Sequence, residues 1–427
     1  MNDKKLPLFL RDFTLVVIGQ IISLFGNAIL RFALPLYLLR ETGSSSLFGA
    51  VTACSFIPMI LLSLAGGVFA DRMNKRNIMV ILDFSTALLI TVFYLMLGKL
   101  PVVPLMIVCL MALYGISGAY QPAVQGSIPL LVLPGQIMQA NAVINMVSTL
   151  AGLLGPVIGG ILFGTWGLFP ILSISILCFI CSAVMEIFIR IPHERRETEA
   201  GIFSVVKSDL KESFLYIRNE KPVLLSVVTV LALFNLVLSA SMIVGIPVII
   251  VKILQMRDAA LGFTQGALGF GGLAGGVLGG IFSERLQLRN CHLLLAICSF
   301  TAACMGISLL PFFSPMAGYL TITVMSFIAM AASTVFLIQI CSAVQLQSPP
   351  HLLGKIMAAL MAVSGCSQPL GQALYGILFD RFAEVSFLVL FGSAAVSLVI
   401  SLYSRNIFLR MELDESRSLQ SCQAQNL

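Results

Sequence analysis

The sequence predicts an all-α membrane protein with twelve transmembrane helices arranged as two six-helix bundles. Three observations predict it: an apolar composition, apolar stretches long enough to cross a bilayer, and a repeat that relates the two halves of the chain. Of the 427 residues, 58% are hydrophobic and only 10% are charged, and the mean hydropathy is +1.01. A soluble domain usually has about a quarter charged residues. The expected solvent of this chain is therefore the bilayer.

Apolar stretches of roughly 20 residues, each able to cross about 30 Å of hydrocarbon, are separated by Gly, Pro or charged residues. The predicted helices span residues 13–39, 47–70, 78–97, 104–126, 140–163, 168–189, 223–251, 261–282, 291–311, 316–345, 354–379 and 386–409. The long polar stretch between the sixth and seventh helices has a partly amphipathic pattern. We therefore expect an N-terminal bundle over 1–190, a cytoplasmic linker over 191–221, a C-terminal bundle over 222–410 and a cytoplasmic tail over 411–427.

The distribution of Lys and Arg predicts the orientation, because these residues are retained on the cytoplasmic side. With both termini inside, nineteen of them fall in cytoplasmic segments and five on the opposite side. The net charge of +6 then reflects membrane topology, and no nucleic-acid partner is expected. The first apolar stretch has no small-residue cleavage site after it, so it is interpreted as a transmembrane helix and not as a signal peptide.

The ten cysteines predict neither a disulfide framework nor a metal centre, because nine of them lie in or at the ends of apolar stretches. Cys178 and Cys181 form a CxxC pair, but no His or second Cys pair accompanies them. They are interpreted as small polarizable residues that pack on a helix. We expect no metal and no cofactor.

An internal repeat appears when the chain is shifted by about 213 residues. The second half then lies on the first with glycine, acid and base in matching order, and Pro156 falls on Pro369. At a shift of 212, Pro35 meets Pro247 near the outer ends of the first and seventh helices. Parallel repeats joined by a cytoplasmic linker are typical of one large class of alternating-access transporters.

Several motifs resemble the major facilitator superfamily. The segment Gly67-Val-Phe-Ala-Asp-Arg-Met-Asn-Lys-Arg76 resembles its loop between the second and third helices, with Asn74 where that motif usually has glycine. Gly155-Pro-Val-Ile-Gly-Gly160 resembles the core of its fifth-helix antiporter motif, with Ala151 in place of the glycine expected four residues earlier. Tyr120-Gln-Pro-Ala and Ser23-Leu-Phe-Gly-Asn27 resemble the drug-efflux branch that includes macrolide and enterobactin-type siderophore exporters. The resemblance implies a monomeric secondary transporter of a bacterial cytoplasmic membrane that exports small amphipathic molecules.

The resemblance also implies gating elements. The acid–base cluster at the cytoplasmic end of the second helix would act as a latch between helices, and the alternative is a solvated anchor of the positive-inside kind. The glycines of the fifth helix would form a rocking seam, and the alternative is ordinary close packing. The candidate gating residues are Gly67, Asp71, Arg72, Arg76, Gly155, Pro156, Gly159, Gly160, Glu284 and Arg285.

A polar stripe on the first helix predicts a substrate path. Gln20, Ser23, Asn27 and Arg31 share one helix face. A stripe that ends in a cation is expensive against lipid, roughly 2.5–3.5 kcal/mol for the Arg alone, so it should face a central cavity. Further candidates for substrate contacts are Tyr114, Gln121, Asn235, Gln265, Gln339 and Gln368, each of which could equally form a hydrogen bond between helices.

Proton coupling has less support from the sequence. None of the 19 acids falls near the middle of a predicted helix, and Asp83 and Glu186 come nearest. Asp83 is expected chiefly as a structural partner of the Asp71 cluster, with proton coupling as the second reading. At Asn27 related efflux proteins commonly have an acid, and an amide cannot titrate. The sequence has no GxxxxGK[ST] loop for ATP and no nucleophile–base pair at a helix end, so an enzyme is not expected. A proton-linked exporter, an uncoupled or differently energised facilitator or importer, and a non-transporting sensor or scaffold all stay open.

Overall fold

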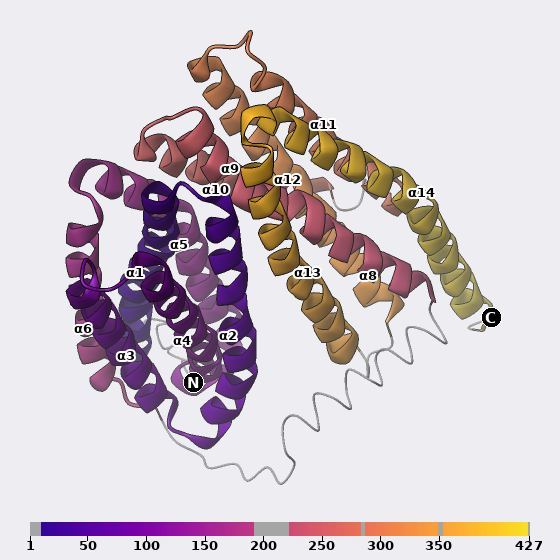
Figure 1. Ribbon diagram of the computed structural model, residues 1–427. Coiled ribbons are helices and arrows are strands. Elements are labelled where there is room, and N and C mark those ends of the chain that lie inside the picture. Colours follow the sequence, from indigo (N-terminus) through magenta and orange to yellow (C-terminus); the bar gives the residue numbers. More distant parts are fainter. Residues whose placement is uncertain (1–9, 192–221, 283–286, 349–352, 426–427) are drawn as a thin grey trace. The chain divides into compact units, whose positions relative to one another are not determined.

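We analysed a computed structural model of the chain, which describes residues 10–191, 222–282, 287–348 and 353–425 (Figure 1). Nearly all of these residues lie in helices, and the described part of the chain contains no β-strand. Eleven helices among the described residues are long and apolar enough to cross a membrane. A further long helix, α13, spans Leu353–Arg381. The predicted fold class is thereby confirmed.

The first six transmembrane helices are continuous, and some of their ends lie at residues that favour helix ends. They are α1 (Arg11–Thr42), α2 (Ser45–Arg72), α3 (Lys75–Met96), α4 (Val102–Leu131), α5 (Ile137–Trp166) and α6 (Leu168–Ile187). Gly43 ends α1 in the left-handed conformation, with φ of 60°, which glycine adopts at little cost. Asn74 caps α3, because its side-chain oxygen accepts a hydrogen bond from the backbone N–H of Arg76 at 3.0 Å.

The seventh transmembrane segment is interrupted by two π-helical stretches. It consists of α8 (Pro222–Phe234), a π-helix at Asn235–Ser239, α9 (Ala240–Pro247) and a second π-helix at Val248–Ile253. Such stretches insert a residue into the helical hydrogen-bond ladder and are frequent at functional sites. The transmembrane segment predicted over 223–251 is confirmed in extent, and its two π-helical stretches are a feature that the apolar pattern does not specify.

The remaining helices are α10 (Asp258–Phe282), α11 (Cys291–Ser308), α12 (Pro315–Gln347), α13 and α14 (Ser386–Gln425). The α14 helix continues well past residue 409, where the sequence pattern places its end. The apolar pattern marks only the part that the bilayer can cover, whereas the following residues, Arg410–Gln425, include many good helix formers and no Gly or Pro.

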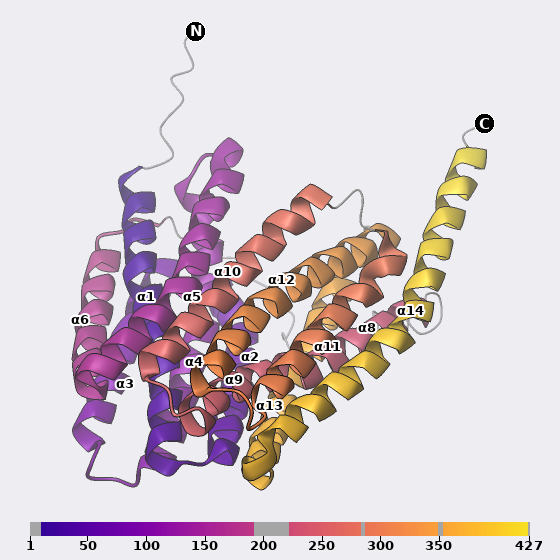
Figure 2. The same cartoon turned by 90° about the horizontal axis from the view of Figure 1, so that it is seen from above.

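The chain forms two compact units. The first comprises Met1–Gly43, Ala50–Ile202 and Arg257–Gly266, and the second comprises Ser44–Gly49, Phe203–Met256 and Ala267–Leu427. In the first unit α1 packs against α5 and α6, and α3 packs against α4 and α6 (Figure 2). Its core contains fully buried side chains from these helices, among them Leu30, Phe93, Leu113 and Phe179.

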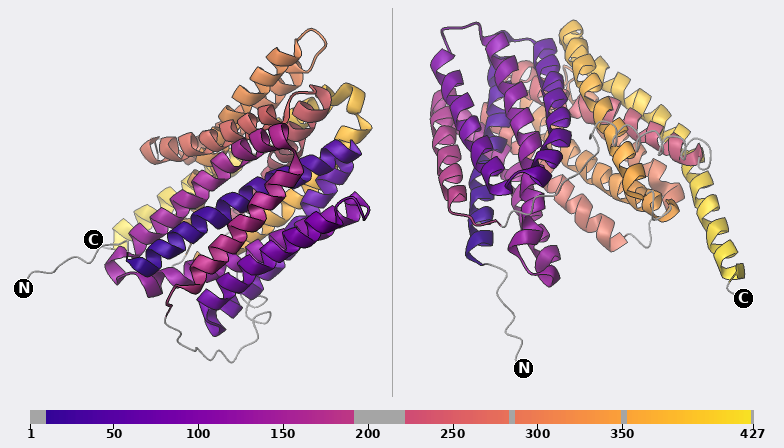
Figure 3. Two further views of the ribbon diagram at one scale, coloured as in Figure 1. Left: turned by 90° about the vertical axis from the view of Figure 1, so that its left-hand side faces the viewer. Right: turned by 90° about the horizontal axis from the view of Figure 1, so that it is seen from below.

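In the second unit α11 lies beside α12 and α14, and α13 packs against α9 (Figure 3). A chain of aromatic rings runs through this unit. The centroids of Phe234 and Phe336 are 5.5 Å apart, and those of Phe336 and Phe408 are 6.1 Å apart. Rings at such distances stabilise a core beyond the apolar area that they bury.

A carboxylate also organises the second unit. Asp380, near the end of α13, accepts hydrogen bonds from the backbone N–H groups of Ser45 and Ser46 and from the Ser44 hydroxyl, each at 2.8 Å. The Lys252 ammonium donates to the same carboxylate at 2.9 Å. The first turn of α2 therefore receives a negative charge at its N-terminus, where the helix dipole favours one.

Candidate functional site

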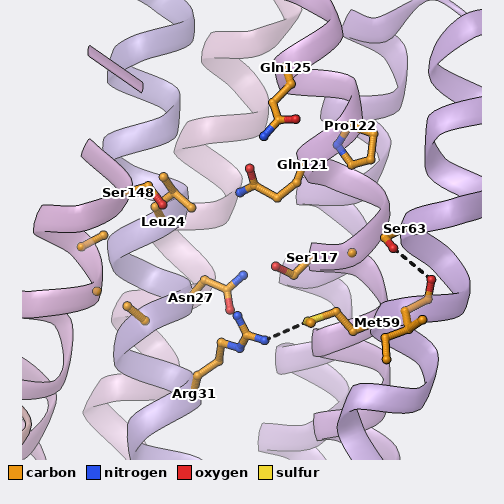
Figure 4. Close-up of a pocket in the computed structure, with 15 residues that line it drawn as sticks. Leu24, Asn27, Arg31, Met59, Ser63, Ser117, Gln121, Pro122, Gln125 and Ser148 are labelled. Atoms are coloured by element: carbon orange, nitrogen blue, oxygen red, sulfur yellow. Dashed lines mark hydrogen bonds between the residues drawn. The ribbon is translucent and has the colours of Figure 1, made fainter. Parts of the chain in front are cut away.

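The first unit contains a cavity of about 450 Å³ between α1, α2, α4 and α5 (Figure 4). Its wall is apolar at Leu24, Met59 and Ile60 and at the small residues of α5. The polar side chains that line it are Asn27, Arg31, Ser63, Ser117, Gln121, Gln125 and Ser148. A volume of this size lies within the range of sites for small organic ligands.

Arg31 supplies the positive charge of the cavity. Its guanidinium carbon lies 3.6 Å from the centre of the Tyr114 ring, so the cation rests on an aromatic face. One guanidinium nitrogen, Nη2, contacts the Met59 sulfur at 3.5 Å. Arg31 and Asn27 are one helical turn apart on α1. The Asn27 side chain points toward Ser117 of α4, and the Arg31 guanidinium points toward Met59 of α2 (Figure 4).

The structure divides the polar stripe that the sequence predicts on the first helix. Asn27 and Arg31 line the cavity, whereas Gln20 is 0% exposed, Ser23 is 5% exposed, and neither lines it. The expectation that all four share one cavity is therefore wrong for Gln20 and Ser23. The stripe extends along several turns of α1, and the space beside its N-terminal half is occupied by side chains of α3, α4 and α6.

Gln20 and Ser23 belong to a buried cluster that contains both candidate proton-coupling acids. The Gln20 amide donates a hydrogen bond to the Tyr120 hydroxyl at 2.7 Å, and this hydroxyl donates to Glu186 Oε1 at 2.6 Å. The Ser23 hydroxyl donates to Asp83 Oδ1 at 3.1 Å. Four helices, α1, α3, α4 and α6, thus meet at these five side chains, and we call them the acid cluster.

The acid cluster has more acceptors than donors. Glu186 is 0% exposed and Asp83 is 2% exposed. Glu186 Oε2, Asp83 Oδ2 and Gln20 Oε1 are buried, and none of them has a hydrogen-bond partner among the described residues. The ion pairs found among the described residues join Arg40 to Asp258 and Lys252 to Asp380, so no cation neutralises the cluster there. Two buried carboxylates without a cation are costly when ionised, and protons bound to them would supply the missing donors.

Asp83 accepts its described hydrogen bond from Ser23. The side chain of Asp71 lies outside the described structure, so the expected role of Asp83 as a structural partner of the Asp71 cluster stays a prediction. Sequence reasoning also passed over Tyr120 as a site residue and used it only as part of a motif. The sequence does contain a feature that marks Tyr120 as a candidate, because it is a polar aromatic residue in an apolar helix. What was missing was knowledge of which helices surround it.

The candidate latch residues are described only in part. Gly67, Asp71 and Arg72 lie in the last turns of α2, whose side chains from residue 64 to 72 are outside the described structure. Glu284 and Arg285 also lie outside the described residues. Arg76 is half-buried, and its side-chain Nε is buried without a hydrogen-bond partner. The latch therefore stays a prediction.

The glycines of α5 lie where this helix approaches its neighbours closely. A side-chain carbon at Gly155 would lie 2.4 Å from the Cβ of Ala28 on α1, and one at Gly160 would lie 2.8 Å from the Cα of Gly262 on α10. A side-chain carbon at Gly159 would lie 3.1 Å from Cδ1 of Phe32, and Pro156, which has no backbone N–H to donate, lies in the same stretch. These contacts explain why small residues are needed, and both close packing and a rocking seam require them.

The candidate residues outside the first four helices do not line this cavity. Asn235, the first residue of the π-helical stretch, donates a hydrogen bond to the Ser364 hydroxyl at 2.7 Å inside the second unit. Gln339 is 9% exposed, and Gln265 and Gln368 are half-buried. For Asn235, the helix-to-helix hydrogen bond is therefore the role that its contacts support.

Comparison with known proteins identifies the family. The sequence model described as Major Facilitator Superfamily matches residues 16–372, which is most of the chain. This chain belongs to the major facilitator superfamily. As a member of it, the protein is a multi-pass membrane transporter, and the family resemblance of its motifs is confirmed.

Curated relatives of this major facilitator carry efflux and siderophore names. Macrolide efflux protein A of Streptococcus pyogenes is 25% identical over 391 residues, covering 90% of this chain and 93% of the relative. The multidrug efflux pump Tap of Mycolicibacterium fortuitum is 24% identical, with 89% and 90% covered. The staphyloferrin A transporter of Staphylococcus aureus is 20% identical, with 92% and 95% covered.

Solved structures of other transporters share the fold. A bacterial homologue of the iron transporter ferroportin in an inward-facing state aligns with a TM-score of 0.70 and 17% identity, covering 95% of this chain and 99% of that one. A bacterial homologue of the human lysosomal transporter Spinster aligns with a TM-score of 0.67 and 15% identity, covering 94% and 97%. At these identities the likeness shows the fold alone.

Proposed function

We propose that this protein exports small amphipathic organic molecules by alternating access and that proton entry drives the export. The observation that carries the proposal is that two helices serve both the cavity and the acid cluster. On α1, Ser23 contacts Asp83, and Asn27, one turn later, lines the cavity. On α4, Tyr120 belongs to the cluster, and the next residue, Gln121, lines the cavity.

This arrangement lets the charge of the cluster act on the substrate site. A protonated Glu186 has a donor to offer at Oε2, whereas an ionised Glu186 has only acceptors. Gain or loss of that proton changes which hydrogen bonds can hold α1, α4 and α6 together. Because α1 and α4 also form the cavity wall, the protonation state and the shape of the cavity are coupled through rigid helices.

The proposed direction of transport and the proposed membrane location depend on other observations. Relatives with efflux names align over most of their length, which favours export. The distribution of Lys and Arg favours cytoplasmic termini in a bacterial cytoplasmic membrane. We further propose that the monomer is the working unit, with bundles over 1–190 and 222–410, and that the clusters at Asp71 and Glu284 form the cytoplasmic latch.

The test is gradient-driven transport in inside-out vesicles, with a panel of dyes and macrolides. Acidifying the lumen should drive uptake by the wild type, and a protonophore should abolish it. Glu186→Gln and Asp83→Asn imitate the protonated acids, so these variants should lose gradient-driven uptake and keep downhill exchange. Glu384→Gln, at an exposed residue, is the matched control and should behave as the wild type.

Each failure has a separate meaning. Uptake that survives both the protonophore and Glu186→Gln would contradict proton coupling and favour the uncoupled facilitator. Absence of uptake of every compound would contradict export of drug-like molecules and favour import, a narrow native substrate, or a sensor that does not transport.

A further inference from the structure

The charge of the cavity in the first unit has one sign. Among the fifteen side chains that line it, Arg31 is the only charged one. Asp83 and Glu186 are not part of the lining, and both are almost fully buried in the acid cluster. Among the described residues of the lining, a ligand in this cavity therefore meets a positive charge and no negative one.

The contacts of Arg31 leave its hydrogen-bonding capacity largely unused. A guanidinium has five N–H donors in a planar fork. In the described structure its partners are the face of the Tyr114 ring, which has no lone pair in the plane of the fork, and the Met59 sulfur, a weak acceptor. Neither ion pair found among the described residues includes Arg31. The ring and the sulfur hold the cation in place without neutralising it.

The neutral neighbours of Arg31 suit the same kind of ligand. Asn27, Ser117 and Gln121 surround the guanidinium side of the cavity, and each side chain can donate a hydrogen bond (Figure 4). Together they offer an oxyanion a cation and several donors. A cationic ligand would instead be placed beside an unneutralised cation, a repulsion that selects against it.

We propose that this cavity takes amphipathic organic anions, with a carboxylate of the ligand paired in bidentate fashion to Arg31. The apolar part of the ligand lies against Leu24, Met59 and Ile60. The inference rests on the proposed function only in treating this cavity as the substrate site. It narrows that function, because neutral and cationic amphiphiles become the poorer substrates.

The charge of the substrate has a consequence for energetics. In a bacterial cytoplasmic membrane the inside is negative, so the membrane potential alone favours the exit of an anion. Each 100 mV changes the equilibrium accumulation ratio of a monovalent anion by roughly 50-fold. A neutral analogue transported without protons has no such response, so the charge of the ligand also appears in the voltage dependence of transport.

The test measures binding of three fluorescent probes to the purified full-length protein in detergent. The probes are pyrenebutyrate, its methyl ester and pyrenebutylamine, which share one apolar body, and their own fluorescence reports binding. The wild type should bind the carboxylate about 10- to 100-fold more tightly than the ester, as expected for a charge-assisted pair. Arg31→Gln should remove this preference, and Arg31→Lys, which keeps the charge and loses the fork, should keep part of it. Lys99→Gln removes one exposed cation elsewhere and should leave the preference unchanged.

Equal binding of the three probes, binding of none of them, or a carboxylate preference that persists in a folded Arg31→Gln protein would overturn the proposal. The melting temperature of each variant in detergent shows whether the variant is folded. If Arg31→Gln is not folded, Arg31→Lys is the deciding variant, and an undiminished carboxylate preference in it would overturn the proposal. Arg31-dependent binding without export in vesicles would support the ligand class and contradict the proposed efflux. Export of the ester and the amine as readily as the carboxylate would support efflux and contradict the ligand class.

Discussion

Replacing Tyr120 with phenylalanine removes one oxygen atom from the centre of the acid cluster. That hydroxyl accepts a hydrogen bond from the Gln20 amide at 2.7 Å and donates one to Glu186 at 2.6 Å. The other oxygens of Gln20 and Glu186 already lack partners. In Tyr120→Phe both side chains would therefore lose the hydrogen bonds that the described structure gives them.

The expected loss of stability follows from two broken hydrogen bonds. A buried polar group left without a partner costs about 1–3 kcal/mol in soluble proteins. Measurements in membrane helices average about 0.6 kcal/mol per hydrogen bond and reach about 1.7 kcal/mol. Because these groups lie in a helical membrane bundle, we expect a total of about 1–3 kcal/mol. For a unit of this size that corresponds to a fall in melting temperature on the order of 5 °C.

A thiol-reactive dye measures this change in a protein whose other nine cysteines are replaced by serine, because Cys109 is buried and becomes reactive only when the first unit opens. Tyr94→Phe is the control. Tyr94 is 36% exposed and packs edge-on against Phe169, and its hydroxyl has no hydrogen bond among the described contacts. It should melt as the wild type does. If Tyr120→Phe melted with Tyr94→Phe and kept gradient-driven transport, the hydrogen-bonded cluster would play no part in stability or coupling, and the reasoning would be refuted.

Two further predictions concern packing and charge. Gly155→Ala should destabilise the protein by about 1–3 kcal/mol, because the new methyl group overlaps Ala28. Gly152 lies one turn earlier on α5, and a side-chain carbon added there would have no atom within 4 Å. Gly152→Ala should therefore be neutral or stabilising by up to about 1 kcal/mol. Equal melting temperatures of Gly155→Ala and Gly152→Ala would contradict the contact assigned to Gly155. Asp380→Asn should lower the melting temperature through loss of about 1–3 kcal/mol, because the carboxylate accepts from Lys252 and from the first turn of α2. If Asp380→Asn kept the wild-type melting temperature in both low and high salt, the stabilising role of the Asp380 carboxylate would be contradicted.

The sequence was sufficient for the helices, because a bilayer imposes a simple rule. Every backbone polar group must be satisfied inside the membrane, so an apolar stretch of sufficient length becomes a helix whatever surrounds it. The positions of twelve helices, the repeat and the family followed from that rule and from short motifs. The rule does not specify local irregularity, and so the π-helical stretch at Asn235–Ser239 was not foreseen.

The partners of the polar side chains were decided by tertiary structure alone. Gln20 and Arg31 lie on the same face of α1, yet one belongs to the acid cluster and the other to the cavity. Asp83 and Glu186 lie on helices that are far apart in the sequence, and only the packing of α6 against both α1 and α3 brings the two acids into one cluster. A periodic pattern defines which face of a helix is polar, but the side chains that meet this face come from other helices. Their identity depends on how the helices pack, which no single segment of the sequence contains.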